Sequence, residues 1–124
     1  MKHKILLTDD SNVNRSYLKS ILEEQNFEVM EASSGHDALD IVVTTPPDAM
    51  ILDLMMPGIG GLDILKMIRA KVYKFPILIF TSDYKEITKK NCLDAGANEV
   101  LYKPTKPQHL LSIINNLFSN LPIT

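Results

Sequence analysis

Three aspartates, one threonine and one lysine each stand at the end of a short apolar run of the sequence. The runs end at Asp9 and Asp10, at Asp53, at Thr81 and at Lys103. Three carboxylates that meet at one place repel one another, which raises the pKa of at least one of them or demands a cation. Such an all-oxygen set suits a hard divalent ion such as Mg²⁺. A carboxylate nucleophile, a metal ion, an ammonium and a hydroxyl would together make a phosphoryl-transfer site.

Each of these residues also has an ordinary structural explanation. The pair Asp9-Asp10 precedes a helical pattern, where carboxylates commonly cap the helix. Asp53 fits a strand-ending turn, Thr81 fits a cap of the next helix, and Lys103 fits a solvated surface position. None of these explanations predicts that all five residues follow apolar runs, and so we favour a shared site.

Apolar runs and helical patterns alternate along the chain and would position these residues. The runs predict strands over residues 5–7, 27–32, 49–52, 77–80 and 100–102. Helical periodicity follows each run, with the fourth helix predicted over residues 84–95 and ended by Gly96. Each strand–helix–strand unit implies a parallel pair with a right-handed crossover. The fold class is therefore predicted to be α/β, a doubly wound five-stranded parallel sheet with helices on both faces.

The polarity of the second strand suggests the order of the strands. Glu28 and Glu31 make the run over residues 27–32 polar, which suits an edge strand. The flavodoxin-like order 2-1-3-4-5 places this strand at an edge and makes the first and third strands neighbours. Asp9, Asp10 and Asp53 would then meet at the carboxyl ends of the strands, where ligands bind in such sheets.

The first helix is predicted to be amphipathic. Ser11 or Asn12 is the expected N-cap, because both side chains can accept from a free backbone N–H. The spacing predicts an apolar face that consists of Val13, Tyr17, Leu18, Ile21 and Leu22.

Composition narrows the class of protein. The 124 residues suit one domain, and 13 basic against 15 acidic residues argue against binding nucleic acid through a general positive field. The absence of Trp argues against a stacking platform for single strands. The single cysteine, Cys92, excludes an internal disulfide, and no Cys/His cluster indicates zinc. The start of the chain lacks the apolar stretch of a signal peptide and no segment suits a membrane span, so we expect a cytoplasmic protein.

The ordered set of motifs resembles the receiver domain of two-component response regulators, across essentially the full chain. No single motif is specific, but the set in this order and at this spacing is highly specific. The flavodoxin-like strand order is also what the resemblance implies. The matching stretches are Leu7-Thr8-Asp9-Asp10, Asp53-Leu54-Met55-Met56-Pro57-Gly58, Gly61, Phe80-Thr81-Ser82, Ala95-Gly96-Ala97 and Lys103-Pro104.

The resemblance implies a role for each residue that would handle phosphate. Asp53 matches the phosphoacceptor, which takes a phosphoryl group from a phosphohistidine on a sensor histidine kinase or a histidine phosphotransfer protein. Thr81 matches the switch hydroxyl, and Lys103 matches the lysine that pairs with the phosphoryl group. The family has a cis peptide bond before the matching proline, and so we expect Lys103-Pro104 to be cis.

The resemblance also implies a bound Mg²⁺. Asp10 matches the acidic residue that binds the ion directly, and Asp9 matches its neighbour that acts through a water molecule. Asp53 is the further carboxylate ligand, and Met55 stands where the family supplies a backbone carbonyl. The implied protein is a signalling phosphoprotein rather than an enzyme. It assists its own phosphorylation and dephosphorylation and signals to a partner protein, which the sequence does not identify, through a conformational switch.

The sequence departs from the family at one position of the switch. The family usually has Tyr or Phe three residues before the lysine, whereas this chain has Val100 there and Tyr102 beside the lysine. The departure favours an alternative, a pseudo-receiver that acts as a phosphorylation-independent interaction module, while the intact acidic set favours the phosphoacceptor. A flavodoxin-like flavin binder is a third candidate, but the carboxylates of Asp9 and Asp10 would repel its phosphate.

The predicted elements account for nearly the whole chain. We expect a single receiver domain over residues 1–124, with a core over about residues 4–118. Only residues 119–124 follow the last predicted helix, which are too few for an output domain. If the chain is complete, its output must be contact with another protein.

Overall fold

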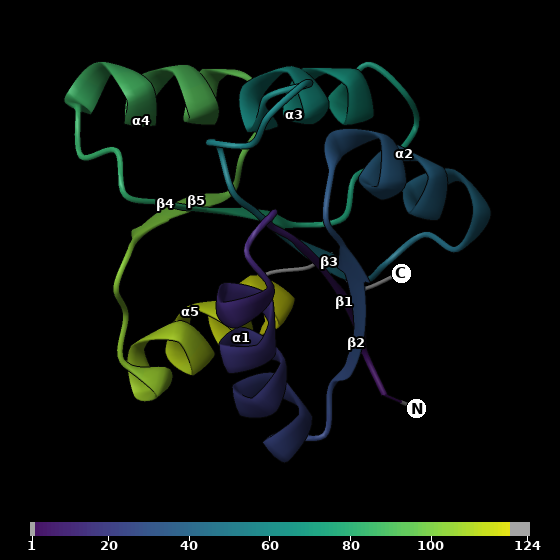
Figure 1. Cartoon of the computed structure of the whole chain (residues 1–124), viewed down its shortest axis with the longest axis vertical. Helices are drawn as coiled ribbons and strands as arrows, with labels where there is room; N and C mark the ends of the chain where they lie inside the picture. Colours follow the sequence, from purple (N-terminus) through teal and green to yellow (C-terminus); the bar gives the residue numbers. More distant parts are fainter. Residues whose placement is uncertain (1, 120–124) are drawn as a thin grey trace.

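The five predicted strands form one parallel sheet in the computed structural model, which describes residues 2–119 (Figure 1). Their order is β2-β1-β3-β4-β5, and every neighbouring pair is parallel. The predicted fold class and strand order are confirmed, and the polar second strand lies at an edge. The strands are β1 (Lys4–Thr8), β2 (Glu28–Ala32), β3 (Ala49–Leu52), β4 (Ile77–Thr81) and β5 (Glu99–Tyr102).

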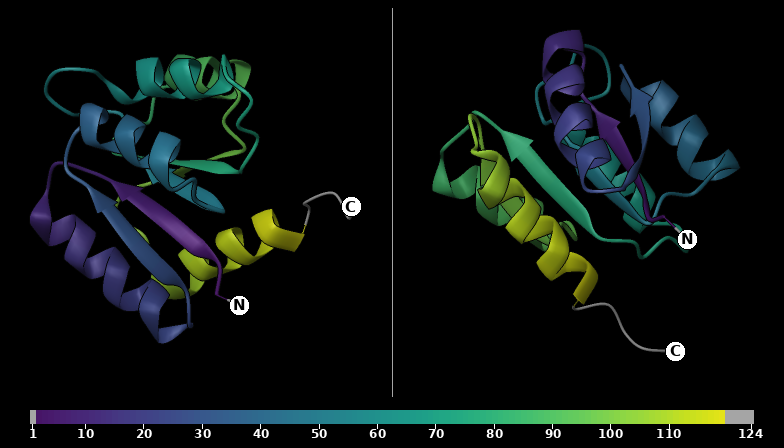
Figure 2. Two further views of the ribbon diagram at one scale, coloured as in Figure 1. Left: turned by 90° about the vertical axis from the view of Figure 1, so that its right-hand side faces the viewer. Right: turned by 90° about the horizontal axis from the view of Figure 1, so that it is seen from below.

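Helices cover both faces of the sheet. On one side lie α1 and α5, and on the other lie α2, α3 and α4 (Figure 1), a layering that two further directions of view also show (Figure 2). This is the doubly wound arrangement that alternating strands and helices predict. The helices are α1 (Asn12–Glu24), α2 (Gly35–Thr44), α3 (Gly61–Arg69), α4 (Glu86–Asp94) and α5 (Pro107–Ser119).

Two apolar cores hold the helices against the sheet. Leu6 belongs to the core under α2, α3 and α4, whereas Ile5 and Leu7 belong to the core under α1 and α5. Successive side chains of a strand point to opposite faces, so that one strand serves both cores. Every residue of β3 and β4 is buried. Polar side chains that could bind a ligand therefore lie at the ends of these strands.

The fourth helix begins later than its periodicity predicts. It begins at Glu86, so that Tyr84 lies in the preceding loop and the predicted start at residue 84 is wrong. The Asp83 carboxylate explains the delay, because it accepts from the Lys85 backbone N–H at 3.0 Å and from the Thr88 hydroxyl at 2.8 Å. The backbone at Lys85 is extended, with φ of −70° and ψ of 135°. The loop is thus held open ahead of the helix.

The first turn of α1 buries a different side chain from those predicted. Val13 is 78% exposed and Tyr17 is 47% exposed, whereas Arg15 is only 9% exposed. The rest of the predicted face is buried, and Ser11 is the N-cap. The prediction for Val13 and Tyr17 is wrong because this turn lies against the polar end of the sheet. A donor is needed there for the Asp9 carbonyl oxygen, and Arg15 supplies it.

The bounds of two strands differ by one residue from the prediction. β2 begins one residue later than predicted and β5 one residue earlier. Most of the expected tail, residues 120–124, lies outside the described residues. Among residues 2–119, none of the helices combines the length and the apolar character that crossing a bilayer requires.

Candidate functional site

Asp9, Asp10 and Asp53 meet at the carboxyl end of the sheet. The parallel register pairs Thr8 with Leu52, so that the next residues, Asp9 and Asp53, leave the sheet side by side. One carboxylate oxygen from each of the three aspartates lies within 4.8 Å of the others. Asp9 and Asp53 are buried, with 4% and 6% exposure, whereas Asp10 is exposed. The structure thus brings together the acidic cluster that the strand order predicts.

Donors of the chain already engage the Asp9 carboxylate. One oxygen accepts from the Ser11 backbone N–H at 2.9 Å. The other accepts from the Asn14 side-chain amide at 3.4 Å and from the Lys103 ammonium at 2.9 Å. The exposed Asp10 carboxylate forms no hydrogen bond or ion pair with other residues in the described part of the chain, 2–119. A cation entering the cluster would therefore meet an available ligand in Asp10 and an engaged one in Asp9.

Lys103 brings a positive charge to the cluster from the end of β5. Its ammonium lies 2.9 Å from Asp9 Oδ2 and 3.6 Å from Asp53 Oδ2, and its side chain is 20% exposed. The peptide bond that joins Lys103 to Pro104 is cis, as predicted. Because the ammonium lies between the two buried carboxylates, it offsets part of their mutual repulsion.

Burial is the largest influence on the ionisation of Asp53. Loss of water disfavours the charged carboxylate and raises its pKa. The Met55 backbone N–H, 3.2 Å from Oδ1, and then the Lys103 charge lower this pKa. The charges of Asp9 and Asp10 raise it again. The net pKa is above the ordinary value, so that the folded chain holds an ionised Asp53 at a cost that a neighbouring cation would reduce.

The raised pKa of Asp53 predicts how stability depends on pH without a metal ion. Above this pKa the folded chain carries an unfavourable buried charge, so Asp53→Asn is expected to unfold at higher denaturant concentration than the wild type at neutral pH. The difference should shrink as pH falls through the raised folded pKa toward the ordinary carboxyl pKa, because the wild-type group then binds a proton preferentially in the folded state. Denaturant unfolding with chelator across this pH range measures the difference in stability between the variant and the wild type. A difference that does not depend on pH would contradict the raised pKa of Asp53.

Thr81 ends β4 beside the cluster, and it is completely buried. Its hydroxyl oxygen accepts from the Asp83 backbone N–H at 3.1 Å. Its carbonyl oxygen accepts from the Lys103 backbone N–H at 2.8 Å. Thr81 is therefore joined both to the loop before α4 and to the residue that carries the ammonium.

Tyr84 joins the same loop to the end of β5. Its hydroxyl donates to the Lys103 carbonyl oxygen at 2.5 Å, and its ring centre lies 5.1 Å from that of Tyr102. Tyr84 is nevertheless 61% exposed. Val100, where the resemblance implies an aromatic residue, is buried in the core under α2, α3 and α4. The helical pattern of the sequence does not predict the Tyr84 contact, because it places this residue inside a helix.

Gly61 sets the backbone that follows Asp53. The Gly61 N–H donates to the Leu54 carbonyl oxygen at 3.1 Å, at the first residue of α3. A Cβ atom on Gly61 would lie only 2.7 Å from the Leu54 Cα and would overlap the Asp53 carbonyl oxygen. Only a residue without a side chain allows α3 to start this close to the loop that carries Asp53 and Met55.

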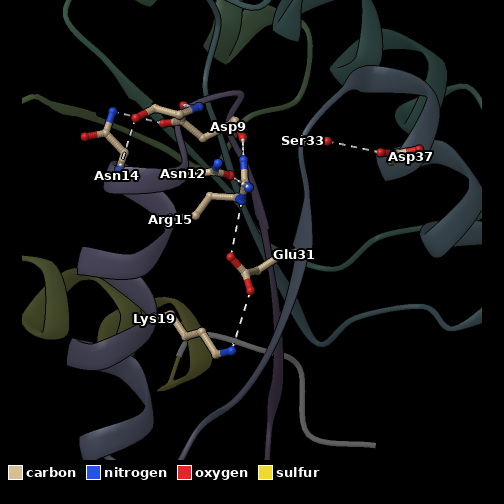
Figure 3. A network of polar contacts seen from close by, with 9 residues as sticks. Asp9, Asn12, Asn14, Arg15, Lys19, Glu31, Ser33 and Asp37 are labelled. Atoms are coloured by element: carbon tan, nitrogen blue, oxygen red, sulfur yellow. Dashed lines mark hydrogen bonds and ion pairs between the residues drawn. The ribbon is translucent and has the colours of Figure 1, made fainter.

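Arg15 borders the cluster and was not identified from the sequence. Figure 3 shows its guanidinium between the first turn of α1, the end of β1 and the edge strand β2. An arginine near the start of an amphipathic helix carries no periodicity signal, because long charged side chains are usually solvated. The only sequence signal was Glu31, a carboxylate on the strand beside β1.

Known proteins of one family resemble this chain. The family model described as "Response regulator receiver domain" matches residues 5–115. This chain belongs to that family. A receiver domain is a signalling domain, and the chain is thus a receiver domain of the kind that two-component response regulators contain.

The receiver has similar relatives among curated proteins and solved structures. It is 40% identical over 118 residues to a nitrate/nitrite response regulator protein homolog of Haemophilus influenzae, covering 94% of this chain and 57% of the relative. It is 34% identical over 110 residues to the alkaline phosphatase synthesis transcriptional regulatory protein PhoP of Bacillus subtilis, covering 89% and 46%. The receiver spans about half the length of these relatives.

Solved structures agree with the fold of the receiver. The chemotaxis protein CheY4 of Vibrio cholerae superposes with a TM-score of 0.90 at 31% identity, covering 94% of this chain and 99% of that one. The Francisella response regulator 1452 receiver domain gives a TM-score of 0.90 at 27% identity, covering 95% and 98%. The expected receiver resemblance is therefore confirmed at the level of family and fold.

Proposed function

We propose that this receiver accepts a phosphoryl group on Asp53 from a phosphohistidine of a sensor histidine kinase or a histidine phosphotransfer protein. The observation that carries the proposal is the placement of the Asp53 carboxylate, beside two other aspartates and 3.6 Å from the Lys103 ammonium. A carboxylate nucleophile needs the added charge of phosphate to be neutralised. The Lys103 ammonium supplies a positive charge for this at the carboxyl end of the sheet.

The proposed transfer forms one bond and breaks another. A carboxylate oxygen of Asp53 attacks the phosphorus, the phosphorus–nitrogen bond to the histidine breaks, and its electron pair stays on the imidazole nitrogen. Lys103 then turns its ammonium from the carboxylates to a phosphoryl oxygen, which it suits as a compact charge. No separate substrate is turned over, so the domain assists its own phosphorylation and dephosphorylation.

The donor set fits Mg²⁺, a hard ion that prefers oxygen ligands and binds through one or two carboxylates with water and phosphate. Asp10 and Asp53 would hold the ion directly, together with the Met55 backbone carbonyl, and Asp9 would act through a water molecule. The engaged state of the Asp9 carboxylate and the exposure of Asp10 support this division. Bound Mg²⁺ would neutralise the negative charge that gathers on the phosphoryl oxygens.

The signal would leave through the loop between β4 and α4. When the Thr81 hydroxyl turns to a phosphoryl oxygen, the Asp83 backbone N–H loses its acceptor. The loop also carries Tyr84, whose hydroxyl holds the Lys103 carbonyl, so that rearrangement would reach the end of β5. Phosphorylation would thus shift the population between two conformations, one of which a partner protein recognises.

Beryllofluoride with Mg²⁺ tests the proposed function without a kinase. We expect the mimic to shift the NMR signals of the Thr81, Asp83 and Tyr84 amides strongly, because the hydroxyl of Thr81 changes its partner. In Thr81→Ala the mimic should still bind, but the shifts at Asp83 and Tyr84 should fall to less than about half. Wild-type spectra that do not respond to beryllofluoride and Mg²⁺ would contradict the proposal.

The alternative function is that of a pseudo-receiver, a constitutive interaction module. Val100 supports it, because the usual aromatic reporter is absent from its position. The acidic cluster and its lysine oppose it, because an interaction module has no need for three clustered carboxylates. Absence of any response to beryllofluoride would favour this alternative.

The proposal also covers the domain organisation and the location of the protein. We propose a single receiver domain over residues 1–124 with a core over about 4–118, a cytoplasmic location, and no direct binding of nucleic acid. The relatives are longer regulators, and the activities of those whole proteins belong to them. The downstream partner would be a protein that distinguishes the two conformations of the α4 region.

A further inference from the structure

Arg15 is nearly buried at the edge of the acidic cluster, and each of its donor groups has a partner. The side chain comes from the first turn of α1 and is 9% exposed. Its Nη1 donates to the backbone carbonyl oxygen of Asp9 at 2.5 Å, and its Nη2 donates to the Asn12 side-chain oxygen. Its Nε donates to Glu31 of β2 at 3.2 Å. One guanidinium thus joins the loop after β1, the start of α1 and the edge strand (Figure 3).

These contacts hold the backbone on both sides of the Asp9 Cα atom. In the preceding peptide unit the Asp9 N–H donates to the Ala32 carbonyl oxygen at 3.2 Å, and in the peptide unit that joins Asp9 to Asp10 the Asp9 carbonyl oxygen accepts from Arg15. The position of Asp10 follows from that peptide plane, since its own carboxylate is held by no other side chain in the described residues. The orientation of the exposed ligand therefore depends on the buried arginine.

We propose that Arg15 is a positioning residue, which orients the Asp9–Asp10 segment to receive a divalent cation. The inference rests on the proposed metal site. It assigns this chain a residue that acts through the backbone rather than by touching the ion or the phosphoryl group. Residues that orient metal ligands from behind typically change metal affinity by about 10–100-fold when replaced.

Electrostatics alone predicts the opposite change in Mg²⁺ affinity when Arg15 is replaced. A positive charge close to a cation site repels the ion, so that removing it should strengthen binding of Mg²⁺. Glu31 reduces this repulsion, because it forms an ion pair with Arg15. Its other oxygen lies 3.5 Å from the Lys19 ammonium. Weaker binding after loss of Arg15 would therefore report its geometry and not its charge.

Lys19 offers a matched control. It carries the same charge on the same helix and shares Glu31 with Arg15, but no contact joins it to Asp9 in the described residues. Lys19→Met removes a charge that shares Glu31 with Arg15 and leaves the Asp9 peptide in place. Arg15→Lys keeps the charge and removes the planar fork that reaches three partners at once.

The test is a titration of the full chain with Mg²⁺, followed by NMR through the amide signals of Asp10 and Met55. We expect Arg15→Lys and Arg15→Met to weaken Mg²⁺ binding about tenfold, and Lys19→Met to change it less than about twofold. Thermal unfolding in chelator measures stability separately, so that a variant that binds Mg²⁺ weakly while remaining folded reports positioning. Arg15→Lys keeps the test informative if Arg15→Met does not fold.

The outcomes separate this inference from the proposed function. If Arg15→Lys binds Mg²⁺ as the wild type does, or if Arg15→Met binds it more tightly, Arg15 is not a positioning residue although the metal site stands. If the wild-type chain binds no Mg²⁺, the proposed metal site is wrong and this inference falls with it.

Discussion

Asp53→Asn is expected to abolish phosphoryl uptake when the protein is incubated with Mg²⁺ and acetyl phosphate. The amide has no negative oxygen to attack phosphorus, so we expect the rate to fall at least about 100-fold, as for other lost nucleophiles. The fold should survive, because burial already disfavours the ionised carboxylate. Phosphorylated protein separated on a phosphate-affinity gel measures the rate.

Asp63→Asn is the matched control for this variant. Asp63 is an exposed aspartate in the first turn of α3 and lies outside the acidic cluster. Its replacement should leave uptake at the wild-type rate. Equal uptake in Asp53→Asn and the wild type would contradict the assignment of the phosphoacceptor, whatever Asp63→Asn does.

Gly61→Ala is expected to lower the free energy of unfolding by about 3 kcal/mol, at the upper end of the range for overpacking. The added methyl group would overlap the Asp53 carbonyl oxygen and lie 2.7 Å from the Leu54 Cα. Backbone atoms cannot rotate away as a flexible side chain can, so either the loop after β3 or the start of α3 must move. Chemical denaturation monitored by circular dichroism measures the loss.

Gly60→Ala provides the control at the preceding residue. The nearest atom to its added methyl group is the Leu54 carbonyl oxygen at 3.7 Å, an ordinary contact distance. The expected change in the free energy of unfolding is less than about 1 kcal/mol. If Gly60→Ala and Gly61→Ala lowered stability equally, the close approach at Gly61 would not be the cause.

The strand-end residues could be predicted from the sequence because simple rules decide them. Asp9 and Asp53 follow strands that are parallel neighbours, so the sheet places them together whatever the helices do. Glu28 and Glu31 indicate that their strand lies at an edge, and the flavodoxin-like order is consistent with that place. Lys103 follows β5, which is not a neighbour of β1 or β3, but its strand ends at the same edge of the parallel sheet and its long side chain reaches Asp9.

Other features could not be predicted because contacts distant in the sequence decide them. Arg15 is buried because the Asp9 carbonyl and Glu31 converge on it, which helical periodicity does not encode. Tyr84 lies in a loop because Asp83 takes up donors at the start of α4, and no apolar pattern reveals that choice. In both places the need to pair polar groups with hydrogen-bond partners decides the local structure, and not the spacing of apolar residues.

The proposed function depends most directly on which residue carries the phosphoryl group. The direct measurement is mass spectrometry that maps the modified residue after incubation with acetyl phosphate, in Mg²⁺ and in chelator. We predict one phosphoryl group per chain, on Asp53, formed in Mg²⁺ and nearly absent in chelator. A phosphoryl group on another residue, none at all, or equal modification in chelator would contradict the account.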